Sequence, residues 1–327
     1  MIRLTIPADN YDLQRTFEPS FVSSMYEKVH SRKWIKITGT FKGMTLEQNR
    51  SEVVVTFPSH VSEKALREIA IAESGLWHEA FEDQLSSVSR KFRNILEALA
   101  EAYPGVRIPV ALHDLGRILI SVLLSKRANY DMVRAWCKKI WSRYEDLEGL
   151  LKAPRAEIEE IGRSYQIFEA VESLKNLIKN HGDGDLQSFL RELSSKPPEL
   201  ARITLLSGKG IGPKIADSII LSAYKAPYVA PCDVHLEKFV RRTRIVEEFS
   251  MPVKALCQKY VCTRDASEKY GLPICPRRER CLRAILTSSL RDLAGWFQTL
   301  TYLHGRKFCK TANPNCRQCP LRIICRR

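Results

Sequence analysis

The sequence predicts a mainly α-helical protein with a small N-terminal antiparallel β domain and a cysteine-rich C-terminal region. Three observations lead to this class. Strand-like alternation is confined to residues 3–57, segments of helical length follow residue 62, and the chain beyond residue 248 is rich in Cys, Arg and Pro. With 327 residues, 44% of them hydrophobic, the chain is long enough for two or three packed domains.

The N-terminal strands are predicted from alternating and β-branched segments. These segments are "RLTIP", "KWIKITGTF" and "EVVVTF", the last of them closed by Pro58. In the second segment, Ile35, Ile37 and Phe41 fall on one face of a strand. We therefore expect an antiparallel β domain over residues 1–61.

Helices of ordinary length are predicted over residues 62–247, which we expect to form a helical body. Asp114 can cap the segment "LGRILISVLLS", and "PRAEIEEIG" ends at a glycine. The run from Ile118 to Leu124 is apolar on nearly every side, so we expect it to be the central helix of this body. Residues 248–327 then form a third, metal-stabilised region.

The charge balance favours a polyanionic partner. Lys and Arg total 52 against 37 Asp and Glu, a net charge of +15, which suits DNA, RNA or an acidic membrane surface without choosing among them. The longest strongly apolar run, Ile118 to Leu124, is far too short to cross a bilayer, and "MIRLTIPADN" has no signal-peptide core. We therefore expect an intracellular protein with no membrane partner.

A glycine-rich turn separates two apolar segments at about residues 198–224. The stretch "LLSGKGIGPKIADS" places Gly210 and Gly212 between "ELARITLLS" and "KIADSIILSAY", the form of a helix, a tight turn and a second helix. Glycine permits positive φ and close backbone approach, so the turn can direct amide N–H groups at a phosphate oxygen next to a helix N-terminus. An ordinary hairpin whose glycines only form the corner is the alternative.

The stretch "GIGPKIADSIILSAY", followed by "APYVAPCDVH", resembles the helix-hairpin-helix DNA glycosylase superfamily, which includes endonuclease III and the 8-oxoguanine glycosylases. The resemblance places the family's nucleophilic lysine at Lys214 and its catalytic aspartate at Asp233. An amine can attack the sugar C1′, and a carboxylate can stabilise positive charge developing on the sugar. The resemblance thus implies a DNA N-glycosylase with AP-lyase activity. The alternatives are a solvated lysine at Lys214 and a simple helix cap at Asp233.

The resemblance also implies the partner, double-stranded DNA containing a damaged base, bound by a monomer in the cytoplasm at the nucleoid. Such enzymes turn the damaged nucleotide out of the duplex, and a side chain fills the gap. In "VLLSKRANYDMV" that position falls on Arg127. Gly210, Gly212 and Lys209 are the further expected DNA contacts. Gly208 and Lys209 depart from the family, which usually has an apolar residue and a proline there.

Four of the ten cysteines follow the spacing C-x6-C-x2-C-x5-C: Cys309, Cys316, Cys319 and Cys325. Four thiolates suit either a tetrahedral zinc ion or a [4Fe–4S] cluster, and spacing alone does not separate the two. The spacing, preceded by "LHGR", resembles the iron–sulfur loop of endonuclease III. The resemblance therefore implies a structural [4Fe–4S] cluster, with Lys307, Lys310, Arg317 and Arg322 as phosphate contacts.

A second set of cysteines lies in an insertion between Glu248 and Leu282 that the family pattern does not predict: Cys257, Cys262, Cys275 and Cys281. Two disulfides, a zinc site and a second cluster all remain open. Disulfides are slightly favoured because no C-x2-C pair is present.

The two ends of the chain resemble different branches of the superfamily. The N-terminal β domain is similar to that of 8-oxoguanine and alkyladenine glycosylases, whereas the cluster loop resembles endonuclease III. We expect removal of an oxidised base, with an oxidised purine such as 8-oxoguanine ahead of an oxidised pyrimidine. A monofunctional glycosylase for alkylated or deaminated bases and a non-catalytic DNA-binding protein are the alternatives.

Overall fold

Residues 2–58, 63–162 and 164–325 are described by the computed structural model and form one antiparallel sheet and many helices. The strands are β1 (Ile2–Pro7), β2 (Tyr26–His30), β3 (Lys33–Lys36), β4 (Thr45–Asn49) and β5 (Glu52–Phe57). The α-helices are α1 (Leu13–Phe17), α2 (Glu63–Ser74), α3 (Arg90–Ala102), α4 (Leu115–Leu124), α5 (Tyr130–Arg143), α6 (Leu147–Lys152), α7 (Arg155–Gly162), α8 (Tyr165–His181), α9 (Leu186–Ser195), α10 (Pro198–Ser207), α11 (Pro213–Ala223), α12 (Val234–Thr243), α13 (Lys254–Cys257), α14 (Arg264–Tyr270), α15 (Leu282–Leu290) and α16 (Ala294–Lys307). The 3-10 helices are η1 (Phe21–Met25), η2 (Phe81–Ser87) and η3 (Arg291–Leu293).

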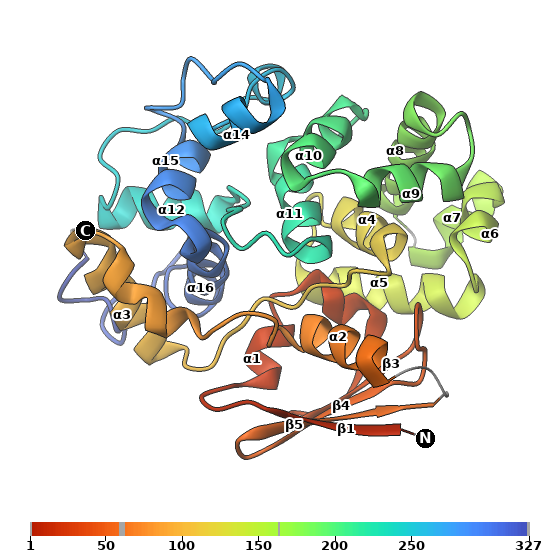
Figure 1. The fold of residues 1–327 in the computed structure, drawn as a ribbon, viewed down its shortest axis with the longest axis horizontal. Coiled ribbons are helices and arrows are strands. Elements are labelled where there is room, and N and C mark those ends of the chain that lie inside the picture. Colours follow the sequence, from red (N-terminus) through yellow and green to blue (C-terminus); the bar gives the residue numbers. More distant parts are fainter. Residues whose placement is uncertain (1, 59–62, 163, 326–327) are drawn as a thin grey trace.

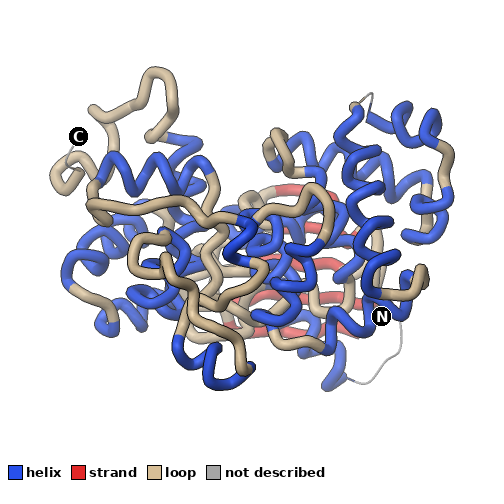
Figure 2. Tube along the Cα trace, turned by 90° about the horizontal axis from the view of Figure 1, so that it is seen from above, coloured by secondary structure: helices blue, strands red, loops and turns tan. Residues whose placement is uncertain are grey.

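The helices form two groups above the sheet. In Figure 1 the sheet lies at the bottom, α4 to α11 lie on one side, and α3, α12, α15 and α16 lie on the other. Figure 2, seen from above, shows the strands partly covered by helices and loops. The apolar side chains form two cores: the first joins the sheet to α4–α11, and the second packs residues 81–110 against residues 221–321. Each helix group therefore has its own core, and α11 lies where they meet.

The sheet is antiparallel throughout, with the strand order β1-β5-β4-β3-β2. Leu4 pairs with Val55 in the register of β1 and β5, and both are buried. The predicted strands correspond to β1, β3 and β5, whereas β2 and β4 carry polar sequences such as "TLEQN" that no alternation reveals.

The buried face of β3 carries Trp34 and Lys36, whose exposed fractions are 3% and 1%. Ile35 and Ile37 are therefore less buried than their neighbours, whereas Phe41 lies beyond the end of β3 and packs against the first core. The prediction that the three share one face of a strand was wrong, because apolar alternation cannot foresee a buried lysine or the end of the strand. β3 also ends at Lys36, earlier than "KWIKITGTF" suggested.

Lys36 is accommodated by two carboxylates from the helices. Its Nζ donates to Glu73 Oε1 at 2.6 Å and to Asp114 Oδ2 at 2.7 Å, and Tyr26 Oη donates to Glu73. Asp114 stands at the N-cap position of α4 as predicted, but it makes no side-chain cap bond. Its Oδ1 instead accepts from Thr40 N at 2.9 Å. A buried charge needs partners, and here they tie the sheet to α2 and α4.

The segment predicted as the central helix is α4, and its residues from Ile118 to Leu124 are all buried. Within the described residues, no helix is long and apolar enough to cross a membrane. The expected domain boundary at 61/62 lies in residues 59–62, outside the described residues, and the boundary at 247/248 stays a prediction.

Candidate active site in the cleft beside the hairpin

A cleft of about 770 Å³ lies beside the helical hairpin formed by α10 and α11. Its walls come from both helix groups, from η1, the α4–α5 loop, α11, the segment before α12, and α16. Both residues predicted to be catalytic are among its lining residues, which include Phe21, Ser125, Lys126, Arg127, Lys214, Asp233, Met251 and Gln298.

Lys214 is the second residue of α11, directly after the hairpin turn. Its Nζ donates to Ser125 Oγ at 2.8 Å and lies 5.5 Å from the centroid of the Phe21 ring. Burial lowers the pKa of Lys214 from 10.5 to about 8, and the Asp233 carboxylate opposes this shift. An amine with this pKa is neutral in a useful fraction of molecules near neutral pH, as a nucleophile requires.

Asp233 is the N-cap of α12, and its Oδ1 accepts from Leu236 N at 2.8 Å. Its Oδ2 accepts from Gln298 Nε2 of α16 at 3.2 Å. The cap therefore uses one carboxylate oxygen and leaves the other at the cleft. Lys214 and Asp233 line the same cleft and interact electrostatically.

The two hairpin glycines differ in conformation. Gly210 has φ +74°, and a Cβ there would lie 2.8 Å from Lys126 Nζ. Gly212 has φ −98° and serves as the N-cap of α11, and a Cβ on it would meet nothing within 4 Å. Only Gly210 therefore needs the left-handed conformation that the sequence led us to expect of the turn. At Gly212 the open space leaves room for a close ligand.

The remaining predicted DNA contacts are both exposed. Lys209 lies on the turn, and its backbone N–H donates to Asn176 Oδ1 at 2.9 Å, which leaves its side chain for a ligand. Arg127 lies in the α4–α5 loop with φ +61°, and it donates to Tyr165 Oη at 3.2 Å. A left-handed arginine is strained by roughly 1 kcal/mol, and such strain gathers at functional positions. Its role in filling the gap in the duplex stays a prediction.

Several cleft residues were missed by the sequence analysis. Lys126 donates to Ser173 Oγ at 3.2 Å, and burial lowers its pKa, so the cleft holds a second lysine. Ser125, Phe21 and Gln298 were missed because they come from segments far from Lys214 in the sequence. The run "SKR" at the end of α4 was the one local signal for this wall.

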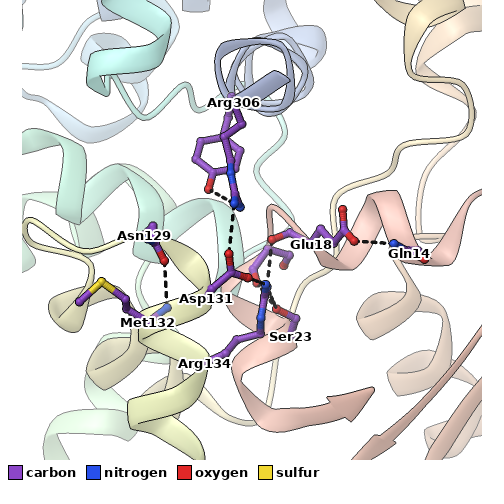
Figure 3. A network of polar contacts seen from close by, with 10 residues as sticks. Gln14, Glu18, Ser23, Asn129, Asp131, Met132, Arg134 and Arg306 are labelled. Atoms are coloured by element: carbon purple, nitrogen blue, oxygen red, sulfur yellow. Dashed lines mark hydrogen bonds and ion pairs between the residues drawn. The ribbon is translucent and has the colours of Figure 1, made fainter. Parts of the chain in front are cut away.

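An ion-pair network lies beside the cleft and includes the lining residue Arg306 (Figure 3). Arg306 of α16 donates to Asp131 Oδ2 at 3.1 Å, and Arg134 binds the other Asp131 oxygen. Arg134 also donates to the Glu18 carbonyl at 3.0 Å and to Ser23 Oγ at 3.2 Å. Hydrogen bonds from the two arginines outweigh burial and lower the pKa of Asp131. The network thus joins α16 to α5 and the N-terminal region.

The four C-terminal cysteines line one small cavity together with residues of α12 and α16. Arg242 donates to Cys309 Sγ at 3.1 Å, and His304 Nε2 lies 3.4 Å from Cys319 Sγ. Burial raises the pKa of the Cys319 thiol, and the other three cysteines of the set add to the rise. In the described part of the chain no three Cys, His, Asp or Glu side chains are placed to hold a single metal ion. The donor set, four thiols around one cavity beside a guanidinium, fits a [4Fe–4S] cluster, which spans a wider space than one ion.

Comparison with known proteins supports the fold and the family. No protein-family model matches the chain. The chain is 20% identical over 318 residues to the N-glycosylase/DNA lyase of Saccharomyces cerevisiae, covering 86% of this chain and 82% of that one. It is 25% identical over 213 residues to endonuclease III of Thermotoga maritima, covering 64% and 81%.

A solved structure agrees over nearly the whole chain. The Clostridium acetobutylicum 8-oxoguanine glycosylase/lyase, in complex with DNA containing cytosine opposite 8-oxoguanine, superposes with a TM-score of 0.64 at 16% identity. The superposition covers 91% of this chain and 93% of that one. By fold the chain is similar to this glycosylase/lyase, and its sequence relatives are an N-glycosylase/DNA lyase and an endonuclease III, in agreement with the resemblance to the helix-hairpin-helix DNA glycosylases.

Proposed function

We propose that this protein is a bifunctional DNA glycosylase/AP lyase that removes an oxidised base from double-stranded DNA in base excision repair. The observation that carries the proposal is that a lysine with a lowered pKa, Lys214, and a carboxylate, Asp233, line the same cleft beside the hairpin. The names of the yeast and Thermotoga relatives support the same class of reaction.

In the proposed reaction, neutral Lys214 Nζ forms a bond to C1′ of the extruded nucleotide. The glycosidic bond breaks, and the base leaves with that electron pair and takes up a proton. Asp233 stabilises the positive charge that develops on the sugar. Opening of the ring gives a Schiff base, loss of a C2′ proton expels the 3′ phosphate by β-elimination, and water releases Lys214.

An oxidised purine is the proposed substrate. The alignment with the yeast relative covers 86% of this chain, and the matching solved structure is an 8-oxoguanine glycosylase/lyase. The cleft also presents flat and polarisable side chains for a base, among them Phe21, Tyr130 and Met251.

The substrate proposal is tested by borohydride trapping on a panel of duplexes. The panel contains 8-oxoguanine, an oxidised pyrimidine, an alkylated base, uracil or no lesion. We expect the strongest covalent adduct and strand cleavage with 8-oxoguanine. Base release without an adduct, on the alkylated or uracil duplex, would instead make the protein monofunctional. Binding with no base release on any duplex would leave only a DNA-binding protein.

We further propose that Cys309, Cys316, Cys319 and Cys325 hold a [4Fe–4S] cluster. When bound, the cluster would cross-link residues 309–325 to one another beside α12 and α16. Arg242 would then balance thiolate charge at Cys309. The basic residues Lys307, Lys310, Arg317 and Arg322 are exposed, and we propose that they contact phosphates.

The two hairpin glycines provide a matched pair for testing the proposed phosphate contact. We expect Gly210→Ala to lower the free energy of unfolding by about 1–2 kcal/mol, because it forces alanine into positive φ near Lys126 Nζ. Gly212→Ala should change stability by less than about 0.5 kcal/mol, since its Cβ meets nothing. It should nevertheless weaken DNA binding about tenfold, because the new methyl group stands where the backbone faces a phosphate.

Urea denaturation measures the stabilities, and fluorescence anisotropy at fixed salt measures the affinities. Wild-type affinity in the Gly212→Ala variant would show that the turn does not approach DNA.

A further inference from the structure

The insertion between α12 and α15 has too little apolar core to hold its own shape. Between residues 248 and 281 it contains only the short helices α13 and α14. Its buried hydrophobic residues are Cys257, Val261, Ala266 and Cys281, and two of these four are cysteines. Segments with so small a core are usually fixed by disulfides or a bound metal.

The backbone brings the four cysteines of the insertion toward one another. Val261 and Ile274 form an isolated β-bridge, and Cys275 N donates to the Val261 carbonyl at 2.9 Å. This pairing brings the backbone at Cys262 close to the backbone at Cys275. Cys281 lies within electrostatic reach of both Cys257 and Cys262. In the described part of the chain no disulfide joins any of them.

The insertion packs on a buried charge cluster that has an excess of one positive charge. Asp217 is 0% exposed, and two buried guanidinium groups bind it: Arg202 Nε donates to Oδ1 at 2.6 Å and Arg283 Nε to the same oxygen at 2.9 Å. Arg283 Nη1 also donates to Cys262 Sγ at 2.9 Å, and the Arg202 guanidinium acts to lower the pKa of the Cys257 thiol, which burial raises. The guanidinium groups of this buried charge cluster thus lie next to cysteine side chains of the insertion.

This charge balance separates the alternatives for the four cysteines. A buried cation without a matching anion costs several kcal/mol. Thiols and disulfides are neutral and leave the excess charge of Arg202, Arg283 and Asp217 unbalanced, whereas thiolates that ligate a metal carry net negative charge. The same arrangement occurs at the C-terminal set, where Arg242 donates to the sulfur of Cys309, a proposed cluster ligand.

We propose that Cys257, Cys262, Cys275 and Cys281 bind a second metal centre through four thiolates, with Arg202 and Arg283 as its charge-balancing partners. The same chemistry suits a zinc ion or an iron–sulfur cluster. In the described residues no three such side chains are placed around a single ion, so zinc requires the sulfurs to move closer, while a cluster spans a wider separation.

The centre has a consequence for the hairpin. Lys254 Nζ donates to the Gly208 carbonyl at 2.8 Å, and Gln258 Nε2 donates to the Leu206 carbonyl at 2.8 Å. Both carbonyls lie at the end of α10, directly before the turn, and Met251 of the same insertion lines the cleft. The second metal centre therefore fixes the position of the hairpin.

The test is the iron and zinc content of anaerobically purified full-length protein, measured by mass spectrometry of the metals. The double variant Cys262→Ser/Cys275→Ser is compared with wild type, with Cys309→Ser/Cys316→Ser, and with Cys137→Ser, a buried cysteine outside both sets. We expect the first variant to lose about one zinc or about four irons while it keeps the metal of the C-terminal set, Cys309→Ser/Cys316→Ser to lose only the metal of the C-terminal set, and Cys137→Ser to lose none. The metal that the Cys262→Ser/Cys275→Ser variant loses, zinc or iron, distinguishes a zinc site from an iron–sulfur cluster.

Equal metal content in wild type and the Cys262→Ser/Cys275→Ser variant would overturn the proposal. Two disulfides, seen as thiols of the insertion that resist alkylation in denaturant until they are reduced, would also overturn it. If the variant fails to fold, the wild-type protein still decides: a chelator or oxidant that removes the second metal should increase amide hydrogen exchange in residues 198–223. None of these measurements depends on glycosylase activity.

Discussion

We expect Lys214→Gln to abolish the borohydride-trapped adduct and to lower base excision with strand cleavage by at least about 10³-fold, because Lys214 is the amine proposed to form the Schiff base. The measurement is single-turnover excision on the preferred lesion duplex. The cleft offers a matched control in Lys126, which is also half-buried and also has a lowered pKa. Lys126→Gln should retain the adduct, and a reversal of the two results would assign the nucleophile to Lys126.

The same amine sets the pH dependence. Because the pKa of Lys214 is about 8, the neutral fraction falls below pH 8, and excision at pH 6 should be about 10²-fold slower than on the plateau above pH 8. A rate that stays constant from pH 6 to pH 9 would show that Lys214 is not the titrating group.

Loss of activity in Lys214→Gln should not come from misfolding. The amine of Lys214 loses its proton more readily in the folded state than in the unfolded state, because its pKa falls from 10.5 to about 8 on folding. It therefore destabilises the fold below pH 8, and this penalty disappears as the pH rises through 10.5. We expect the variant to be more stable than wild type at pH 7 by ~1–2 kcal/mol, after allowance for the open side of the cleft.

Asp233→Asn lowers base excision by about 10²–10³-fold, because the amide cannot offer a negative charge to the sugar. Asparagine keeps the N-cap of α12, whereas Asp233→Ala removes the cap as well and should cost a further ~1 kcal/mol of stability. Excision kinetics and urea denaturation of both variants therefore separate the chemical role from the structural one. Full activity in Asp233→Asn would reduce Asp233 to a cap.

A second readout for Asp233→Asn is cleavage of a preformed abasic site. That substrate needs the amine but has no glycosidic bond to break, so its cleavage should fall much less than base excision. An equal loss of cleavage rate on both substrates would show that Asp233 acts in the Schiff-base chemistry of Lys214 and not in breaking the glycosidic bond.

The parts of the site that are local in sequence could be predicted. Lys214 after a glycine turn and Asp233 before a helix follow from short motifs, and the structure places both in one cleft. Their partners could not be predicted. Ser125 is 89 positions from Lys214, and Gln298 is 65 positions from Asp233, so only the folded chain brings them together.

The fold shows the same division between local and long-range information. The buried helix α4 follows from composition alone, whereas β2 and β4 are polar strands that need their neighbours in the sheet. The burial of Lys36 depends on Glu73 and Asp114, which lie 37 and 78 positions away. Hydrophobic periodicity predicts which face of an element is apolar, but it does not predict buried ion pairs between distant residues.

The second core also constrains how the chain matures during synthesis. Phe81 stacks on Trp296 with ring centroids 5.3 Å apart, and Phe92 meets Phe297 edge to face. When α3 leaves the ribosome, the surface it must cover has not yet been translated. The early helices of this core therefore stay exposed until the residues of α16 have been made. A chain that stops before α16 would consequently be a target for chaperones and proteases, and would lack the cleft residues Gln298, Tyr302 and Arg306.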